Sequence, residues 1–143
     1  MAHPEMILHA TCVSVTGRGV LLTGPSGSGK SALALELMAF GAALVADDRT
    51  VLRRDGVHLS ACAPTAIAGM IEARGVGLLR VDHVPSAHIS LVVDMAQPET
   101  ARLPKPREVT LLDIAVPCLH KVDAPYFPAA VHAYLSGNRI EVE

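Results

Sequence analysis

The chain of 143 residues is poor in aromatic side chains: it has no tryptophan, two tyrosines and two phenylalanines. Half of its residues are nevertheless apolar, and only 18% are charged. This composition excludes an intrinsically disordered chain and leaves the core to Leu, Val, Ile and Ala. The length is enough for one hydrophobic core, so we expect a single domain over residues 1–143.

Other missing features disfavour several partners and compartments. The formal net charge of −2 provides no basic surface for nucleic acid or an anionic membrane. No apolar run is long enough to cross a bilayer, and the first residues lack the basic start of a signal peptide. The cysteines at positions 12, 62 and 118 form no C-x-x-C pair, which argues against a disulfide framework or a zinc site. We therefore expect an unprocessed cytoplasmic protein that binds neither nucleic acid nor membrane.

Patterns along the chain predict both strands and helices. Apolar, β-prone stretches predict strands at residues 6–15, 20–23, 42–46, 50–53, 57–60, 89–93 and 109–116. Asp55-Gly56 marks a hairpin turn, and residues 30–40 and 128–135 predict helices, the second ended by residues 136–138. The glycine-rich stretch 67–81 favours a loop or a short helix over a regular strand. Prolines 98, 104 and 106 mark an exposed connection.

The octet Gly24-Pro25-Ser26-Gly27-Ser28-Gly29-Lys30-Ser31 matches the phosphate-loop pattern G-x-x-x-x-G-K-[ST] between a predicted strand and a predicted helix. Glycines let successive backbone amides point at phosphate oxygens, and the helix start adds its unpaired amides and positive dipole end. Lys30 supplies a charge to the outer phosphates, and Ser31 offers a hydroxyl to Mg²⁺. A chance glycine-rich turn would lack this strand and helix context. The loop predicts a nucleoside triphosphate site but not the acceptor, because ATPases, GTPases and kinases share it.

Metal-assisted phosphoryl transfer also needs an acidic residue at a strand end and a base for the nucleophile. Asp47-Asp48 follows one predicted strand, and Asp94 ends another. We favour the pair, because one carboxylate holds the metal while the other accepts the acceptor's hydroxyl proton. An Asp pair that caps a turn, or Asp94 as the metal residue, remains the alternative.

Two weaker signals flank these motifs. The segment 72–77 contains an acid, a cation and two flexible residues: Glu72, Arg74, Gly75 and Gly77. A loop that closes over phosphate requires such residues. A surface turn with an internal ion pair explains them equally well. His9 in the first strand is either a functional residue or a core histidine.

Taken together, these residues resemble the catalytic domain of HPr kinase/phosphorylase over roughly residues 6 to 95. Three parts of the chain are similar to family motifs and occur in the same order: His9 followed by residues 17–24, the segment Leu44-Val45-Ala46-Asp47-Asp48, and the segment 72–79. The resemblance implies a single α/β P-loop kinase domain of the phosphoenolpyruvate carboxykinase-like type, usually assembled as a hexamer.

The resemblance also implies roles for the site residues. One Asp of the pair is the base that activates the acceptor serine; we assign it to Asp47 and place Asp48 nearer the metal, with Glu72 and Ser31 as further metal ligands. His9 lies near the transferred phosphate, and Arg74 orients its segment.

The chain also departs from the family pattern. It resembles short forms that lack an additional N-terminal domain. The stretch 114–121, comparable to a family loop with a Pro-Gly-Arg segment, contains no arginine, which puts phosphorolysis in doubt.

From the sequence we therefore predict a Mg²⁺- and ATP-dependent protein-serine kinase that phosphorylates the phosphocarrier protein HPr. The alternatives are an ATP-binding regulatory module with weak catalysis and a small-molecule kinase.

Overall fold

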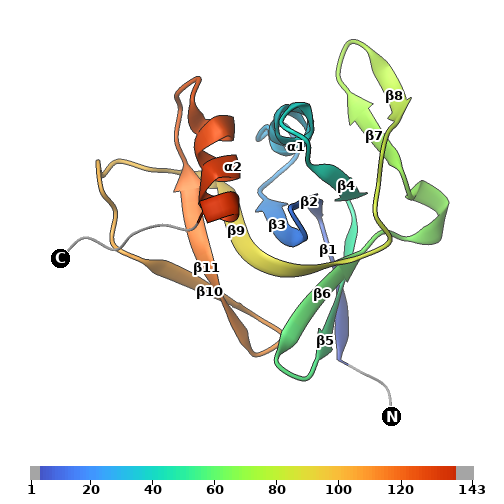
Figure 1. Cartoon of the computed structure of the whole chain (residues 1–143), viewed down its shortest axis with the longest axis horizontal. Helices are drawn as coiled ribbons and strands as arrows, with labels where there is room; N and C mark the ends of the chain where they lie inside the picture. The colour runs from blue at the N-terminus through green and yellow to red at the C-terminus, as the bar shows by residue number, and fades with distance from the viewer. Residues whose placement is uncertain (1–3, 138–143) are drawn as a thin grey trace.

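The computed structural model of the protein describes residues 4–137, which form one large sheet, one small sheet and two α-helices (Figure 1). The helices are α1 (Lys30–Ala39) and α2 (Phe127–Gly137), and a 3₁₀ turn spans Thr65–Ile67. The strands are β1 (Glu5–Leu8), β2 (Ala10–Val15), β3 (Arg18–Thr23), β4 (Ala43–Ala46), β5 (Thr50–Asp55), β6 (His58–Cys62), β7 (Met70–Ala73), β8 (Gly77–Arg80), β9 (Ala87–Pro98), β10 (Arg107–Leu111) and β11 (Ile114–Lys121). Neither helix is long and apolar enough to span a membrane, within the part of the chain that is described.

Nine strands form the large sheet in the order β1-β5-β6-β9-β3-β2-β4, with β11 also beside β9 and β10 beside β11. β9 runs parallel to both β3 and β11, while β2 is antiparallel to both β3 and β4. It follows that β3, β4, β9 and β11 all point their carboxyl ends the same way. The start of β2 lies at that same edge of the sheet.

The central strands are buried on both faces, so their side chains contribute to two cores. On one face the strands pack against α1 and α2 through Val13, Leu22, Leu37 and Val131. Figure 1 shows the two helices on this face of the sheet. On the other face, residues of β2, β3 and β9 pack with residues of β5, β6 and β11 in a second cluster that contains Cys12, Leu21, Leu52, Leu59, Val92 and Val116.

Two stretches differ from the sequence prediction. Residues 67–81, expected as a loop or short helix, contain the β7–β8 hairpin, which pairs Met70 with Arg80 through Ala73 with Gly77 and projects from the sheet. Its outer side chains, such as Val76 and Leu78, are exposed, so the stretch lacks the apolar burial pattern that predicts a strand.

The predicted strand 6–15 is two strands, separated at His9. β1 pairs with β5, whereas β2 pairs with β3 and β4. The stretch 109–116, expected as one strand, lies in a hairpin: β10 and β11 meet at Leu112 and Asp113, both with positive φ. The remaining predicted strands and both helices are present with shifted ends, and Asn138 lies outside the described residues.

Candidate active site

The octet of residues 24–31 joins the end of β3 to the start of α1. Gly24, Gly27 and Gly29 have φ angles of 139°, 83° and 98°, which residues other than glycine rarely adopt. A Cβ on Gly24 would also lie 2.7 Å from Ser28 Oγ. The loop turns back on itself, with the Ser28 amide donating to the Pro25 carbonyl over 3.1 Å. The strand, loop and helix expected from the sequence are therefore present, and the curled backbone fits a phosphate cradle.

The first residue of α1, Lys30, directs its ammonium group into this loop. Its Nζ donates to the Gly24 carbonyl over 2.6 Å and to the Pro25 carbonyl over 3.1 Å, and only 6% of the residue is exposed. The loop therefore holds a positive charge at its centre, the position from which a lysine can contact the outer phosphates of a nucleotide.

Ser31 connects the loop to the acidic pair. Its hydroxyl donates to Asp47 Oδ1 over 2.7 Å. Asp47 also accepts from the Thr11 hydroxyl over 3.1 Å at Oδ1 and from the Glu72 backbone amide over 3.0 Å at Oδ2. The residue is 8% exposed, so these donors fix the carboxylate beside the loop. A serine hydroxyl and a carboxylate side by side are hard oxygen ligands of the kind that Mg²⁺ prefers.

Asp48 takes part in a separate contact at the surface. His9 Nε2 lies 2.5 Å from Asp48 Oδ1, and the two side chains are 50% and 64% exposed. Asp48 has a φ of 66°, a left-handed conformation that is uncommon for residues other than glycine. This turn directs the two neighbouring carboxylates to different partners: Asp47 to Ser31, and Asp48 to His9.

Glu72 and Arg74 belong to the projecting hairpin. The backbone amide of Glu72 donates to Asp47, while Glu72 itself is exposed on β7. Arg74 lies exposed in the turn between β7 and β8. The structure therefore places the hairpin against the acidic pair and leaves both charged side chains at the surface.

Asp94, the alternative metal residue, lies on β9 opposite Thr23 of β3. Its Oδ1 accepts from the Ala96 amide over 2.9 Å. Asp94 is thus next to the strand that enters the loop, but its hydrogen bond is to a residue only two positions away. The carboxylate that accepts from Ser31 is that of Asp47.

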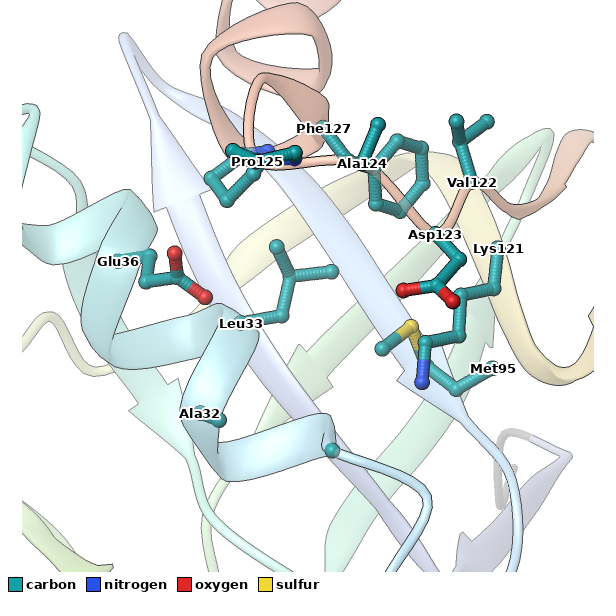
Figure 2. Close-up of a pocket in the computed structure, with 12 residues that line it drawn as sticks. Ala32, Leu33, Glu36, Met95, Lys121, Val122, Asp123, Ala124, Pro125 and Phe127 are labelled. Atoms are coloured by element: carbon teal, nitrogen blue, oxygen red, sulfur yellow. The ribbon is translucent and has the colours of Figure 1, made fainter.

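Two features of the site were missed in the sequence. Thr11 is fully buried and bonds both acidic residues, since its Oγ1 also accepts from the Asp48 amide over 3.4 Å. The sequence signal that could have identified Thr11 is a polar residue within an otherwise apolar predicted strand. The second feature is a pocket of about 310 Å³ beside Gly29, formed by α1, Met95 and the β11–α2 connection (Figure 2). Its residues are far apart in the sequence and match no motif.

The residues present fit a magnesium nucleotide. Within residues 4–137, no three His, Cys, Asp or Glu side chains gather to hold a metal by themselves. Mg²⁺ in phosphoryl-transfer sites does not need such a cluster, because it binds through one or two carboxylates together with substrate phosphates and waters. Ser31 and Asp47 next to the glycine loop supply that smaller set.

The chain is similar to known proteins in sequence and in structure. The family model for the HPr serine kinase C-terminal domain matches residues 1–120. The HPr kinase/phosphorylase of Alkaliphilus metalliredigens is 48% identical over 79 residues, which cover 54% of this chain and 26% of that protein. That of Limosilactobacillus reuteri is 42% identical over 100 residues, which cover 64% of this chain and 31% of that protein. The match thus spans less than a third of either relative.

A solved structure is similar over nearly the whole chain. The structure of the Hpr(Ser) kinase/phosphatase from Coxiella burnetii superposes with a TM-score of 0.80 at 28% identity, covering 93% of this chain and 95% of the other. The resemblance expected from the sequence and the α/β fold class are both confirmed. The chain belongs to the HPr serine kinase C-terminal domain family.

Proposed function

We propose that this chain is a Mg²⁺- and ATP-dependent protein-serine kinase that phosphorylates HPr. The observation that carries the proposal is the hydrogen bond of 2.7 Å between Ser31 Oγ and Asp47 Oδ1, which joins a glycine phosphate loop to an acidic residue. Next to it, the exposed His9–Asp48 pair provides a second carboxylate. The names of the similar proteins support HPr as the acceptor.

The phosphate-binding groups are the loop amides of residues 24–31 and Lys30. We assign the metal to Ser31 and Asp47, whose oxygens already lie together. Bound Mg²⁺ would neutralise negative charge on the phosphates during transfer. In this proposal Glu72 supports the metal site through its backbone amide to Asp47 and remains a candidate further ligand.

We assign the base to Asp48, which reverses the roles we expected for the two acidic residues. An acceptor serine on another protein must reach the base, and the Asp48 side chain is 64% exposed whereas Asp47 is 8% exposed. The serine hydroxyl attacks the terminal phosphorus, its proton passes to the Asp48 carboxylate, and the bond from the terminal phosphorus to the ADP oxygen breaks. His9 orients the Asp48 carboxylate through its Nε2 contact.

The proposal is limited to the kinase direction. The stretch comparable to the arginine-bearing family loop is β11, which contains no arginine. Arg74, at the tip of the β7–β8 hairpin, is proposed to orient that hairpin when the acceptor binds.

We also propose that the protein is cytoplasmic and assembles into a homo-oligomer. The three cysteines are free thiols, and burial raises the pKa of the Cys12 thiol, which keeps it protonated as a core residue. Free thiols support a reducing compartment such as the cytoplasm. By the family resemblance, the active form is proposed to be a homo-oligomer, a hexamer, which light scattering of the purified protein measures directly.

The direct test is a transfer assay. The purified chain is incubated with ATP, Mg²⁺ and HPr from the same organism, and the product is analysed by mass spectrometry for phosphoserine. We expect one phosphoserine on HPr, and none when EDTA is added or when the modified serine is replaced by alanine. ATP binding without any phosphoserine would instead support the regulatory module, and phosphate on a metabolite would support the small-molecule kinase.

A further inference from the structure

Two histidine rings are stacked on the surface of the large sheet. His58 on β6 and His88 on β9 have ring centroids 4.4 Å apart and ring planes 8° apart, and both residues are exposed. Ser60 is the cross-strand partner of His88, and His58 lies two positions before Ser60, so the histidines are diagonal neighbours on one face. His88 is also opposite Arg18, at the start of β3, whereas the phosphate loop follows the end of that strand. The stacked pair is therefore separate from the candidate active site.

The pair lies beside the shortest strand pairing of the large sheet in the described part of the chain. β6 and β9 pair at two positions, Ser60 with His88 and Ala61 with Ala87. By contrast, β9 and β3 pair at six positions. The β1-β5-β6 part of the sheet joins β9 at this short pairing. A cross-link between the two rings would therefore hold two parts of the sheet together where few backbone hydrogen bonds join them.

The two rings have the chemistry and nearly the spacing of a metal site. Neutral imidazole is the commonest metal ligand in proteins, and it suits Zn²⁺, Ni²⁺ and Cu²⁺ better than Mg²⁺. Two imidazoles on one zinc ion, with bonds of about 2.0–2.1 Å, place their ring centroids about 5 Å apart. The observed separation of 4.4 Å is close to this value. The rings must also tilt until one nitrogen of each faces the same point, and exposed side chains rotate freely enough to do so.

The charged side chains next to the pair balance one another. On the neighbouring strands these are Asp55, Arg53 and Arg18. Asp55 is exposed directly opposite His58, where it attracts a cation. Arg53 is paired with Glu5, whose carboxylate accepts from it over 2.8 Å, and Arg18 donates to a carbonyl of α2 over 3.0 Å. The two arginines and the two carboxylates together carry no net charge, so a divalent cation meets no net repulsion at the pair.

We infer that His58 and His88 form a surface site for a divalent transition-metal ion such as Zn²⁺, with water completing its coordination. Within residues 4–137 no three His, Cys, Asp or Glu side chains gather around a metal position, so the protein supplies two ligands. The bound ion joins β6 to β9. The site differs from the proposed magnesium site, because the oxygens of Ser31 and Asp47 suit a harder cation.

Zinc binding to the intact, untagged chain tests the inference. It is measured by calorimetry in excess Mg²⁺, which occupies the oxygen ligands of the candidate active site. His58→Gln and His88→Gln should each lower the zinc affinity at least about tenfold, because each removes one of two ligands. His132→Gln is the matched control: it also removes one ring of a ring pair, the contact with Phe40 at 5.7 Å, and should bind zinc like the parent.

Two further measurements keep the test decisive if a variant folds poorly. In the parent protein, saturating zinc should shift the imidazole nitrogen NMR signals of His58 and His88 together. Zinc should also raise the unfolding temperature of the parent, because it binds the folded sheet. Absence of zinc binding in excess Mg²⁺, unshifted signals of the pair, or unchanged affinity in both glutamine variants would each overturn the inference and leave a stacked pair only. These measurements involve no phosphoryl transfer, so the kinase proposal is tested separately.

Discussion

The two sides of the phosphate loop differ in polarity and in hydrogen bonding. On the acid side, formed by His9, Thr11, Ser31, Asp47 and Asp48, polar side chains are bonded to one another at 2.5 to 3.1 Å. On the pocket side, formed by Ala32, Leu33, Met95, Asp123 and Phe127, apolar and charged side chains line an open cavity. The hydrogen bonds hold the acid side in a fixed geometry, whereas the pocket side contains open space.

Strand direction explains why the sides differ. On the acid side, the antiparallel strand β2 brings Thr11, with His9 just before the strand, to the end of β4 and so to the acidic pair. On the pocket side, β9 and β11 run parallel to β3, so the three strands end at the same edge, where the connection from β11 to α2 leaves a crevice. One sheet thus carries a polar cluster and a cavity on either side of the same loop.

The largest expected effect comes from Lys30→Ala, because this residue lies at the centre of the loop and serves both sides. Charge-assisted hydrogen bonds contribute about 1.5–3 kcal/mol each, so ATP affinity should fall about 10- to 100-fold. Tripolyphosphate affinity should fall by a similar factor, and turnover should fall further because charge stabilisation is lost during transfer. Calorimetry and the transfer assay measure the two effects.

The matched control is Lys105→Ala, an exposed lysine in the β9–β10 connection, which should leave binding and turnover unchanged. Unaltered ATP affinity and turnover in Lys30→Ala would remove the loop from the proposed function, whatever the pocket binds.

The next largest effect distinguishes the roles of Asp47 and Asp48 on the acid side. Asp48→Asn should lower the turnover number about 10²- to 10⁴-fold, the usual contribution of a general base, while the affinity for Mg²⁺ and ATP stays near the parent value. Asp47→Asn should instead raise the Mg²⁺ concentration needed for half-maximal activity, because it removes a carboxylate beside Ser31. Titrating activity against Mg²⁺ for both variants distinguishes the roles.

The reverse pattern would return the base to Asp47, as we first expected from the sequence. His9→Asn serves as the companion variant: if His9 only orients Asp48, combining His9→Asn with Asp48→Asn should cost little more than Asp48→Asn alone.

The phosphate loop could be predicted from the sequence because its conformation is local. Glycines at fixed spacing between a strand and a helix specify the curled backbone, and Gly24, Gly27 and Gly29 do adopt positive φ. The distinct orientations of Asp47 and Asp48 could not be predicted, because they depend on a left-handed φ at Asp48 and on contacts with Thr11 and His9, some 36 to 39 residues away.

The pocket and the β7–β8 hairpin were missed for different reasons. The pocket depends on the parallel pairing of β9 with β3 and β11, which brings Leu33 near Met95 and Phe127 without any local signal. The hairpin pairs β7, which buries Ile71, with the largely exposed β8, and Gly75 and Gly77 within it are usual signals of a loop. Sequence periodicity reports burial, so exposed strands and distant pairings are the features it detects least well.

The smallest expected effect concerns an ion pair that anchors the pocket side. The Glu99 carboxylate bonds Arg107 at 2.5 Å, and the Glu99 amide donates to the Lys121 carbonyl over 2.8 Å, next to the pocket. The hydrogen bond from Arg107, followed by that from the Ala101 amide, lowers the pKa of Glu99 from 4.5 to about 2. A lowered pKa stabilises the fold at pH values above 4.5, and this stabilisation is lost as the pH falls towards 2.

Glu99→Gln should therefore reduce the free energy of unfolding at pH 7, and its difference from the parent should shrink as the pH falls from 4.5 towards 2. Urea unfolding at pH 7, 5 and 3 measures this difference in the free energy of unfolding.

The control Glu5→Gln removes the partner of Arg53 in an exposed ion pair at the edge of the sheet. It should change stability less, because side chains about half exposed are screened by water. Because Asp47 and Ser31 do not contact Glu99, Mg²⁺ dependence at pH 7 should match the parent. A shift in Mg²⁺ dependence with Glu99→Gln would mean that the two sides of the loop are coupled rather than independent.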